Sequence, residues 1–312
     1  MLSVIIPTFN NEKVLPLSIA SALAVEKVSE IIVVDDHSTD NTIDLLKKLS
    51  LNSKKLKFLR NKKNLGTGLT FINGLYEASN EYIIMLNSDD FFIPKGINNL
   101  LDYLISNALE VCYGKMGIKK INKIFKYSHP GYTGKSYVNN RNELKQLLIH
   151  DMYLPSFGTI MKRDILLSFY NKEYYKNLLQ EYGDYFKAHD YDLFINLAKQ
   201  KKKFGFLNET VCIWCPKENS QSGEDYFKSG QAYFESIFLF NRYSDMEKFS
   251  HHEIELIERR VLNKLMKINH DKSFANMKIL NHVNEFKKRI KRLKIGEKKT
   301  KLFNISQRSL LR

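Results

Sequence analysis

The chain has 312 residues, of which 43% are hydrophobic, and a formal net charge of +15. This length and apolar content predict a globular protein with a real core, either one large domain with an appendage or two domains. Three cysteines do not make a disulfide framework, which favours a reducing compartment. We find no signal peptide and no window that approaches the ~20 apolar residues of a membrane span, so we expect a cytosolic protein.

The positive charge is concentrated at the C-terminus. Residues 286–312 contain eleven Lys or Arg and one acid, Glu297, and therefore carry +10, whereas the rest of the chain carries +5. A basic tail on a nearly balanced body predicts an anionic partner that the tail contacts. A membrane surface is favoured over nucleic acid.

The first part of the chain alternates short apolar runs with helical patterns. Predicted strands cover residues 2–6, 30–34, 56–59 and 82–86. Apolar residues at helical spacing follow each of the first three strands. Repeated units of this kind predict an α/β fold with a mostly parallel sheet, whose ligands gather at the carboxyl ends of its strands.

Two of these strands end in acid pairs. Asp35 and Asp36 follow residues 30–34, and the sequence NSDD, residues 87–90, follows residues 82–86. Adjacent carboxylates repel each other unless a positive group lies beside them, and their oxygens suit Mg²⁺ or Mn²⁺. One such pair alone is also typical of a solvated turn, because Asp is a favoured turn residue.

Several motifs stand in an order and spacing that resemble a known family. They are VIIPTFN, VVDDHSTDNT, NLGTGLTFINGLYEASNEYI, MLNSDD, FGTIMKRDIL and HDYDLFINLAKQKKKFGFL. Over about residues 1–222 the chain resembles the family 2 glycosyltransferases of the GT-A fold. The resemblance implies a Rossmann-like domain with a mostly parallel central sheet flanked by helices. A C-terminal helical appendage would follow it.

The resemblance implies a binding site for the nucleotide base, usually uracil. Pro7, Thr8 and Phe9 would line the base, and Asp36 would accept a hydrogen bond from its N3–H, which cytosine lacks. Asp36 has the alternative role of a cap or turn before the next helix. Asp35 is interpreted as structural.

The resemblance also implies a metal site. Asp89 would contact the ribose hydroxyls, and Asp90 would bind the Mn²⁺ or Mg²⁺ that bridges the diphosphate. Asn87 departs from the commoner D-x-D-D form, which leaves Asp90 as the main protein ligand of the metal.

Two further departures concern the diphosphate. Ile72 occupies a place where relatives often carry an Arg, so the metal or another cation must neutralise the diphosphate. Lys62 and Lys63 are candidates for that cation. Lys217 is a further candidate near the end of the predicted domain.

The general base is assigned to Asp190. An inverting transfer needs a carboxylate that takes the proton of the acceptor hydroxyl. The Glu-Asp pair of the family corresponds here to His189 and Asp190, and an imidazolium beside Asp190 would lower the pKa of its carboxyl group. Alternatively, Asp190 or Asp192 merely caps the helix.

The C-terminal part is predicted to be helical. Residues 223–282 form a helical extension and residues 283–312 a basic amphipathic tail. Val283, Phe286, Ile290 and Leu293 share one helical face, which together with the surrounding cations suits an anionic bilayer. Alternatively, this helix packs on its own domain or on a second subunit.

The sequence therefore predicts a cytoplasmic, metal-dependent, inverting glycosyltransferase that is peripheral on the inner face of the plasma membrane. It would move a hexose or N-acetylhexosamine from a UDP-sugar to a glycan or glycolipid hydroxyl in bacterial surface polysaccharide or lipooligosaccharide assembly. One alternative is a sugar-phosphate nucleotidyltransferase, which needs a Gly-rich phosphate loop where P-T-F-N stands. The other is a non-catalytic protein that binds through its basic tail, which leaves the two acid pairs unexplained.

Overall fold

The computed structural model describes residues 1–120, 123–126, 134–138, 142–182, 186–216, 224–268 and 277–294. The chain forms two compact units. The first unit contains Met1–Arg141, Tyr153–Tyr175 and Gln200–Pro216, and the second unit contains Asn142–Met152, Lys176–Lys199 and Lys217–Arg312. This grouping cuts across the boundary predicted at residue 222, because the second unit combines two internal segments with the C-terminal helices.

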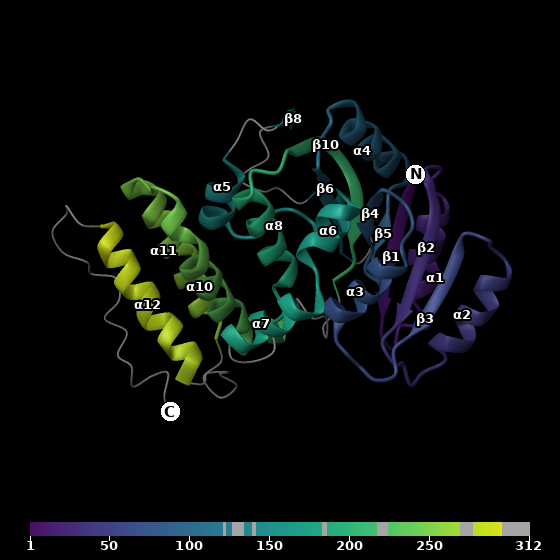
Figure 1. The fold of residues 1–312 in the computed structure, drawn as a ribbon, viewed down its shortest axis with the longest axis horizontal. Helices are drawn as coiled ribbons and strands as arrows, with labels where there is room; N and C mark the ends of the chain where they lie inside the picture. The colour runs from purple at the N-terminus through teal and green to yellow at the C-terminus, as the bar shows by residue number, and fades with distance from the viewer. Residues whose placement is uncertain are drawn as a thin grey trace. The chain divides into compact units, whose positions relative to one another are not determined.

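The first unit begins with the predicted alternation of strands and helices (Figure 1). In chain order these elements are β1 (Leu2–Thr8), α1 (Leu15–Leu23), β2 (Val28–Asp35), α2 (Thr42–Leu51), β3 (Leu56–Arg60), α3 (Thr67–Glu77) and β4 (Tyr82–Met85). β1 pairs in parallel with β2 and β4, and β2 pairs in parallel with β3. The carboxyl ends of all four strands therefore lie at one edge of the sheet, where ligands of open α/β sheets bind.

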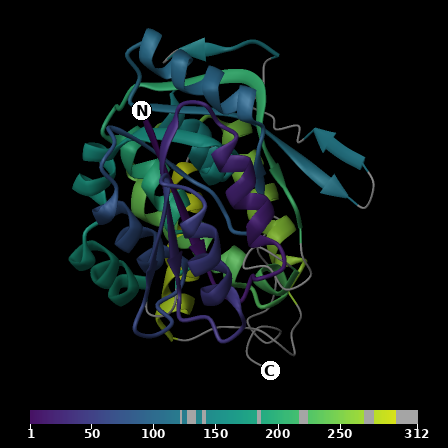
Figure 2. The same ribbon diagram turned by 90° about the vertical axis from the view of Figure 1, so that its right-hand side faces the viewer.

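The remaining strands make the sheet mixed. They are β5 (Phe91–Phe92), β6 (Val111–Lys120), β7 (Lys123–Lys126), β8 (Tyr137–Val138), β9 (Thr159–Lys162) and β10 (Phe204–Trp214). β9 runs antiparallel to both β4 and β6, and β7 runs antiparallel to β6, as the two adjacent strands in Figure 2 show. The α/β fold is confirmed, but the sheet is mixed, whereas the sequence predicted a mostly parallel one.

Helices cover both faces of this sheet. α1, α2 and α4 (Pro94–Ser106) share one apolar cluster with Val4 and Ile6 of β1. Ile5 points to the opposite face, because side chains alternate along a strand, and α3 packs there. A Cβ at Gly74 of α3 would lie 2.5 Å from Cγ2 of Ile5, so the close approach of helix and sheet requires glycine. The carboxyl ends of β1 to β4 are thus supported by a sheet that has helices packed on both faces.

The second unit is helical. It contains α5 (Glu143–His150), α8 (His189–Lys199), α9 (Glu224–Lys228), α10 (Gln231–Tyr243), α11 (His251–Leu265) and α12 (Met277–Leu293), and α7 (Lys172–Tyr182) begins in the first unit. α10 contacts α9, α11 and α12, and residues 231–240 are all buried. A helix that is buried on every side forms the centre of its unit.

α12 corrects the prediction for the C-terminal apolar face. Val283, Phe286 and Ile290 are at most 4% exposed, and the rings of Phe286 and Phe240 of α10 lie 5.4 Å apart. The protein itself covers this face, so these side chains are not available to a bilayer. Among the described residues, no helix is both long and apolar enough to cross a membrane. Residues 295–312 of the predicted tail lie outside the described residues.

Candidate active site

The three residues predicted to line a base lie at the end of β1. Pro7 and Thr8 are buried, whereas the Phe9 side chain is 44% exposed. The Thr8 hydroxyl is buried and has no hydrogen-bond partner within the described part of the chain. A buried hydroxyl without a partner carries a desolvation cost that a ligand would relieve, and an exposed aromatic ring can stack on a base.

The loop after β1 is fixed to the loop after β2. Asn10 has a positive φ of 52°, its backbone N–H donates to Ser38 Oγ at 2.9 Å, and its side-chain oxygen accepts from Thr39 N at 2.8 Å. Asn tolerates this left-handed conformation better than most residues. The turn that carries Phe9 is therefore held against the end of β2.

Asp35 has the structural role that the sequence suggested. Its side chain is fully buried, accepts hydrogen bonds from Ser38 N at 3.1 and 3.3 Å, and forms an ion pair with Arg60 Nε at 3.3 Å. Because its oxygens face the turn and a neighbouring strand, Asp35 stabilises the end of β2.

Asp36 holds the loop that leads into α3. Its Oδ1 accepts from Asn61 Nδ2 and from Leu65 N, and its Oδ2 accepts from Gly66 N, each at 2.8 Å. A carboxylate offers about four acceptor positions, so donors from the described residues use three and leave one on Oδ2. The side chain is 4% exposed. Asp36 therefore both anchors this loop and keeps one acceptor position for a donor group.

Asn61 is a site residue that the sequence reasoning missed. It follows β3 directly, is 8% exposed, and donates to both Asp36 and Thr70 Oγ1. Its own side-chain oxygen accepts from Asn73 Nδ2 at 2.9 Å. This network fixes the orientation of Asp36. The only sequence signal is a polar residue directly after a short strand.

The candidate cations for a diphosphate lie in different settings. Ile72 is fully buried in α3, so the place where relatives often carry an Arg is a core position here. Lys62 and Lys63 are exposed. Lys217 lies outside the described residues.

The strand-end acids Asp89 and Asp90 differ in accessibility. Asp90 is 1% exposed, its Oδ1 accepts from Cys215 N and its Oδ2 accepts from Asn87 Nδ2, both at 2.7 Å. Its backbone oxygen accepts from Ser18 Oγ at 2.6 Å. Asp89, in contrast, is half-buried. Asp90 thus fastens the strand-end turn to the end of β10, and Asp89 is the more accessible carboxylate.

The oxygen groups of this turn fit a divalent cation that a diphosphate helps to bind. Within the described ranges, no group of three or more His, Cys, Asp or Glu could hold a metal ion. Mg²⁺, however, is usually bound through one or two carboxylates together with substrate phosphates. Asp89 is the more accessible of the two carboxylates for such a contact, since Asp90 is buried and accepts two hydrogen bonds.

The HDYDL motif forms the first turn of α8 in the second unit. Asp190 is half-buried, whereas Asp192 is fully buried and accepts from Tyr243 OH at 2.6 Å. Burial raises the pKa of Asp192 to about 6, although the Arg242 charge and the Tyr243 hydroxyl lower it. Burial lowers the pKa of His189 below its ordinary value, although the Asp190 charge raises it, so burial disfavours the imidazolium form of this side chain.

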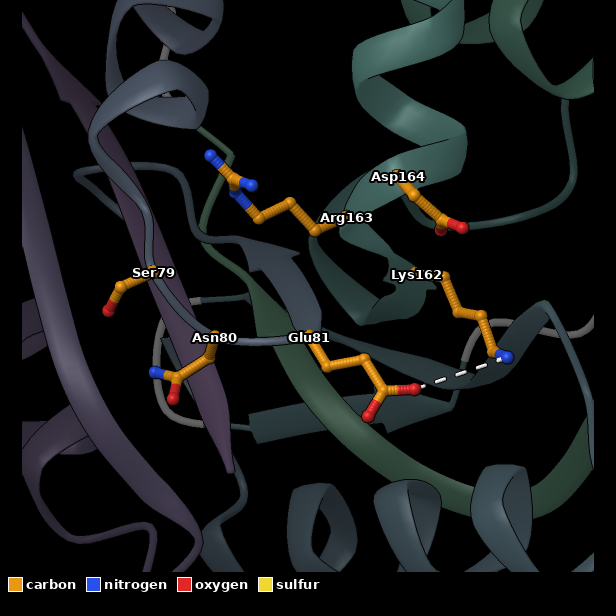
Figure 3. Close-up of a pocket in the computed structure, with 6 residues that line it drawn as sticks. All are labelled: Ser79, Asn80, Glu81, Lys162, Arg163 and Asp164. Atoms are coloured by element: carbon orange, nitrogen blue, oxygen red, sulfur yellow. Dashed lines mark ion pairs between the residues drawn. The ribbon is translucent and has the colours of Figure 1, made fainter.

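An open hollow lies at the other end of β4. It is lined by Ser79, Asn80, Glu81, Lys162, Arg163 and Asp164 (Figure 3). Lys162 Nζ lies 4.0 Å from Glu81 Oε1. Because Glu81 precedes β4 and Asp89 follows it, this hollow is at the opposite edge of the sheet from the acid pairs and takes no part in the candidate site.

Comparison with known proteins decides the family. Residues 3–168, more than half of the chain, match the model of glycosyl transferase family 2. The chain belongs to this family. It is therefore a glycosyltransferase, which excludes the nucleotidyltransferase and the non-catalytic binding protein as alternatives.

Two relatives and one solved structure illustrate the similarity. The chain is 26% identical over 323 residues (97% of this chain, 93% of the relative) to poly(ribitol-phosphate) beta-N-acetylglucosaminyltransferase TarP of Staphylococcus aureus strain N315. It is 27% identical over 203 residues (64% of this chain, 60% of the relative) to the GalNAc(5)-diNAcBac-PP-undecaprenol beta-1,3-glucosyltransferase of Campylobacter jejuni. The structure of S. aureus TarS residues 1–349 with UDP-GlcNAc matches with a TM-score of 0.62 and 18% identity (94% of this chain, 83% of that chain). The last match shows that this glycosyltransferase has the GT-A fold.

Proposed function

We propose that this glycosyltransferase moves a hexose or N-acetylhexosamine from a UDP-sugar to a hydroxyl of a surface glycan or lipid-linked glycan, with inversion at the sugar carbon. The names of the relatives support this proposal. One is a beta-N-acetylglucosaminyltransferase on a ribitol-phosphate polymer, and another is a beta-1,3-glucosyltransferase on a diphosphoundecaprenol glycan. A β-linked product formed from an α-linked UDP-sugar requires inversion.

The observation that carries the proposal is the arrangement of acceptors at the end of β2. Asp36 keeps one acceptor position on Oδ2, and a uracil N3–H can donate to it. Thr8 contributes a buried hydroxyl without a partner in the described structure, and Phe9 contributes an exposed ring. These three groups support the recognition of a uracil base, with Pro7 as buried support beneath it.

We assign the divalent cation and the ribose to the end of β4. From the sequence, Asp89 was predicted to contact the ribose and Asp90 to bind the metal, but the accessibility of the two side chains favours Asp89 for both contacts. Asp90 would then hold the turn in place. A bound Mn²⁺ or Mg²⁺ would offset the negative charge that develops on the leaving diphosphate.

The proposed base is Asp190. The acceptor hydroxyl oxygen forms a bond to the sugar carbon while the bond from that carbon to the diphosphate oxygen breaks, and UDP leaves. The hydroxyl proton passes to the carboxylate of Asp190. The buried Asp192 cannot take this role without unpacking α8, because its side chain is fully buried beside Tyr243.

A cytoplasmic location on the inner face of the plasma membrane follows from the acceptor that we propose. The apolar face of α12 is covered, so contact with an anionic membrane would depend on charge alone. Lys288, Lys291 and Arg292 of α12 are exposed, and each basic residue near an anionic surface contributes about 1 kcal/mol.

A screen of UDP-sugars tests the proposed function. The purified chain is mixed with each UDP-sugar in the presence of Mn²⁺ or of EDTA, and the release of UDP is measured. We expect at least one UDP-hexose or UDP-N-acetylhexosamine to yield UDP that depends on Mn²⁺. Equal release with EDTA would contradict the metal dependence. Release from GDP-sugars alone would contradict the proposal that the donor site recognises uracil.

A further inference from the structure

α10 contains a buried carboxylate that the proposed reaction does not use. Glu235 has no exposed surface and lies within the run of residues 231–240 that forms the centre of the second unit. Burying a charged group without compensation costs several kcal/mol. The burial of the Glu235 carboxylate within an otherwise largely apolar stretch of α10 therefore requires a physical explanation.

The hydrogen bonds of Glu235 supply that explanation. Its Oε1 accepts from Lys187 N and from Gln231 Nε2, both at 2.8 Å. Its Oε2 accepts from Ala188 N at 3.1 Å and from Tyr226 OH at 2.6 Å. Four donors converge on one side chain, and only a carboxylate offers four acceptor positions and no N–H of its own.

Two of these donors lie at the start of the helix that carries Asp190. The Asp192 N–H donates to the Ala188 oxygen at 3.1 Å, so Ala188 occupies the N-cap position of α8. Alanine has no side-chain acceptor that could cap the first turn. Glu235, from another helix, accepts instead from the N–H groups of the N-cap residue and of the residue before it, and so fastens the two residues that precede His189 and Asp190.

We propose that Glu235 is a positioning residue of the transfer reaction, which fixes the first turn of α8 and thereby the orientation of the Asp190 carboxylate. The inference rests on the proposed function, because Asp190 is assigned as the base there. Burial raises the pKa of Glu235 to about 7, although the hydrogen bonds from Lys187, Tyr226, Gln231 and Ala188 lower it. An energetically unfavourable buried carboxyl group therefore lies directly beside the start of the helix that carries Asp190.

The test compares Glu235→Ala and Glu235→Gln with a matched control, Glu258→Gln. Glu258 is 1% exposed, belongs to α11 in the same unit, and pairs with Lys294 at 2.6 Å. It is equally buried but forms its ion pair with α12. Three quantities are measured on each full-length protein: amide hydrogen exchange, the dissociation constant of UDP with Mn²⁺, and kcat for UDP release from the most active donor of the screen.

In Glu235→Ala we expect the amides of Lys187 and Ala188 to exchange at least about tenfold faster, because both lose their acceptor. We expect kcat to fall by about 10-fold to 100-fold, since a small misplacement of a reacting group has effects of this size. The UDP dissociation constant should stay within about twofold of the wild-type value, because the change leaves ground-state donor binding intact. Glu235→Gln should recover part of kcat, because its amide oxygen still accepts.

The inference is overturned if folded Glu235→Ala keeps the wild-type kcat, or if Glu258→Gln loses kcat to the same extent. It is also overturned if kcat falls while the exchange of residues 187 and 188 is unchanged. Should Glu235→Ala fail to fold, Glu235→Gln decides by the same criteria. Asp190→Asn distinguishes the two proposals: wild-type UDP release in that variant contradicts the base assignment, whereas its loss beside a normal Glu235→Ala contradicts only the role of Glu235.

Discussion

The carboxylates of the first unit and those of the second are held in different ways. Asp36 and Asp90 accept hydrogen bonds from loop amides and Asn side chains at one edge of the sheet. Asp192 and Glu235 lie inside packed helices, where burial raises their pKa to about 6 and about 7. Changes in the first unit should therefore alter nucleotide binding, and changes in the second should alter turnover and its dependence on pH.

The largest expected effect belongs to Asp190. Asp190→Asn should reduce kcat for UDP release by about 10²-fold to 10⁴-fold, the usual contribution of a positioned general base. The dissociation constant of UDP, measured by titration calorimetry, should not change. Asp192→Asn is the control, and a loss of turnover confined to that variant would move the base by two residues.

The basic face of α12 gives the next effect. Replacing three exposed cations by Gln should weaken binding to anionic vesicles roughly 100-fold at low salt, since each contributes about 1 kcal/mol. The residues to change together are Lys288, Lys291 and Arg292. A matched control changes the exposed cations Lys47, Lys48 and Lys54 of the first unit. Sedimentation with vesicles measures both, and equal binding of the two variants would show that α12 is not the contact.

The pH dependence of stability sharpens the description of the second unit. The folded-state pKa of Glu235, about 7, lies above its ordinary value of 4.5, so the folded protein binds this proton more tightly. The resulting stabilisation is complete below about pH 4.5 and is lost as the pH rises to about 7. Relative to Glu235→Gln, the wild type should therefore lose roughly 3 kcal/mol of unfolding free energy across this window.

Denaturant unfolding between pH 4.5 and 8 measures this difference. Glu253→Gln provides a control that should show no change in this window: burial raises the pKa of Glu253, but hydrogen bonds from Lys145 and Ser250 outweigh it and lower the pKa overall. The stabilisation that Glu253 contributes is therefore complete above about pH 4.5 and is lost only at lower pH. Parallel curves for the wild type and Glu235→Gln would contradict the assignment of a raised pKa to Glu235.

The smallest effects separate Asp89 from Asp90. Asp89→Asn should weaken Mn²⁺-dependent UDP binding by about tenfold or more, because one charged ligand is lost, and should leave the melting temperature unchanged. Asp90→Asn should lower the unfolding free energy by about 1–3 kcal/mol, because a buried N–H loses its acceptor. If Asp90→Asn melts normally but its UDP binding no longer depends on Mn²⁺, Asp90 is the metal ligand, as predicted from the sequence.

Much of the proposed donor site at the carboxyl ends of the parallel strands was predictable, because the sequence patterns that indicate it are local. Asp35 and Asp36 follow an apolar strand directly, so their place at the sheet edge follows from the chain itself. Which of the two strand-end acids, Asp89 or Asp90, is the accessible one was not predictable. Asp90 is fastened by Cys215 N, 125 residues later in the chain, and no local pattern indicates that contact.

The second unit was less predictable, because an apolar helical face does not specify what covers it. The pattern of Val283, Phe286 and Ile290 fits a bilayer and a neighbouring helix equally well, and α10 covers it here. Glu235 gave a weak signal, as a single acid within the run QAYFESIFLF. Its partners at residues 187 and 188 became apparent only from the hydrogen bonds that they donate to it in the folded protein.

Discrimination between UDP and CDP tests the proposed donor site most directly. The wild-type chain is titrated with each nucleotide in the presence of Mn²⁺, and the two dissociation constants are compared. In the proposed site UDP would donate its N3–H to the remaining acceptor position of Asp36, whereas CDP would present an acceptor there and leave that one position unpaired. We therefore expect UDP to bind at least about tenfold more tightly, in line with the ~1–3 kcal/mol cost of an unsatisfied buried group. Equal affinities for the two nucleotides would contradict the role of Asp36 and with it the assignment of a uridine donor.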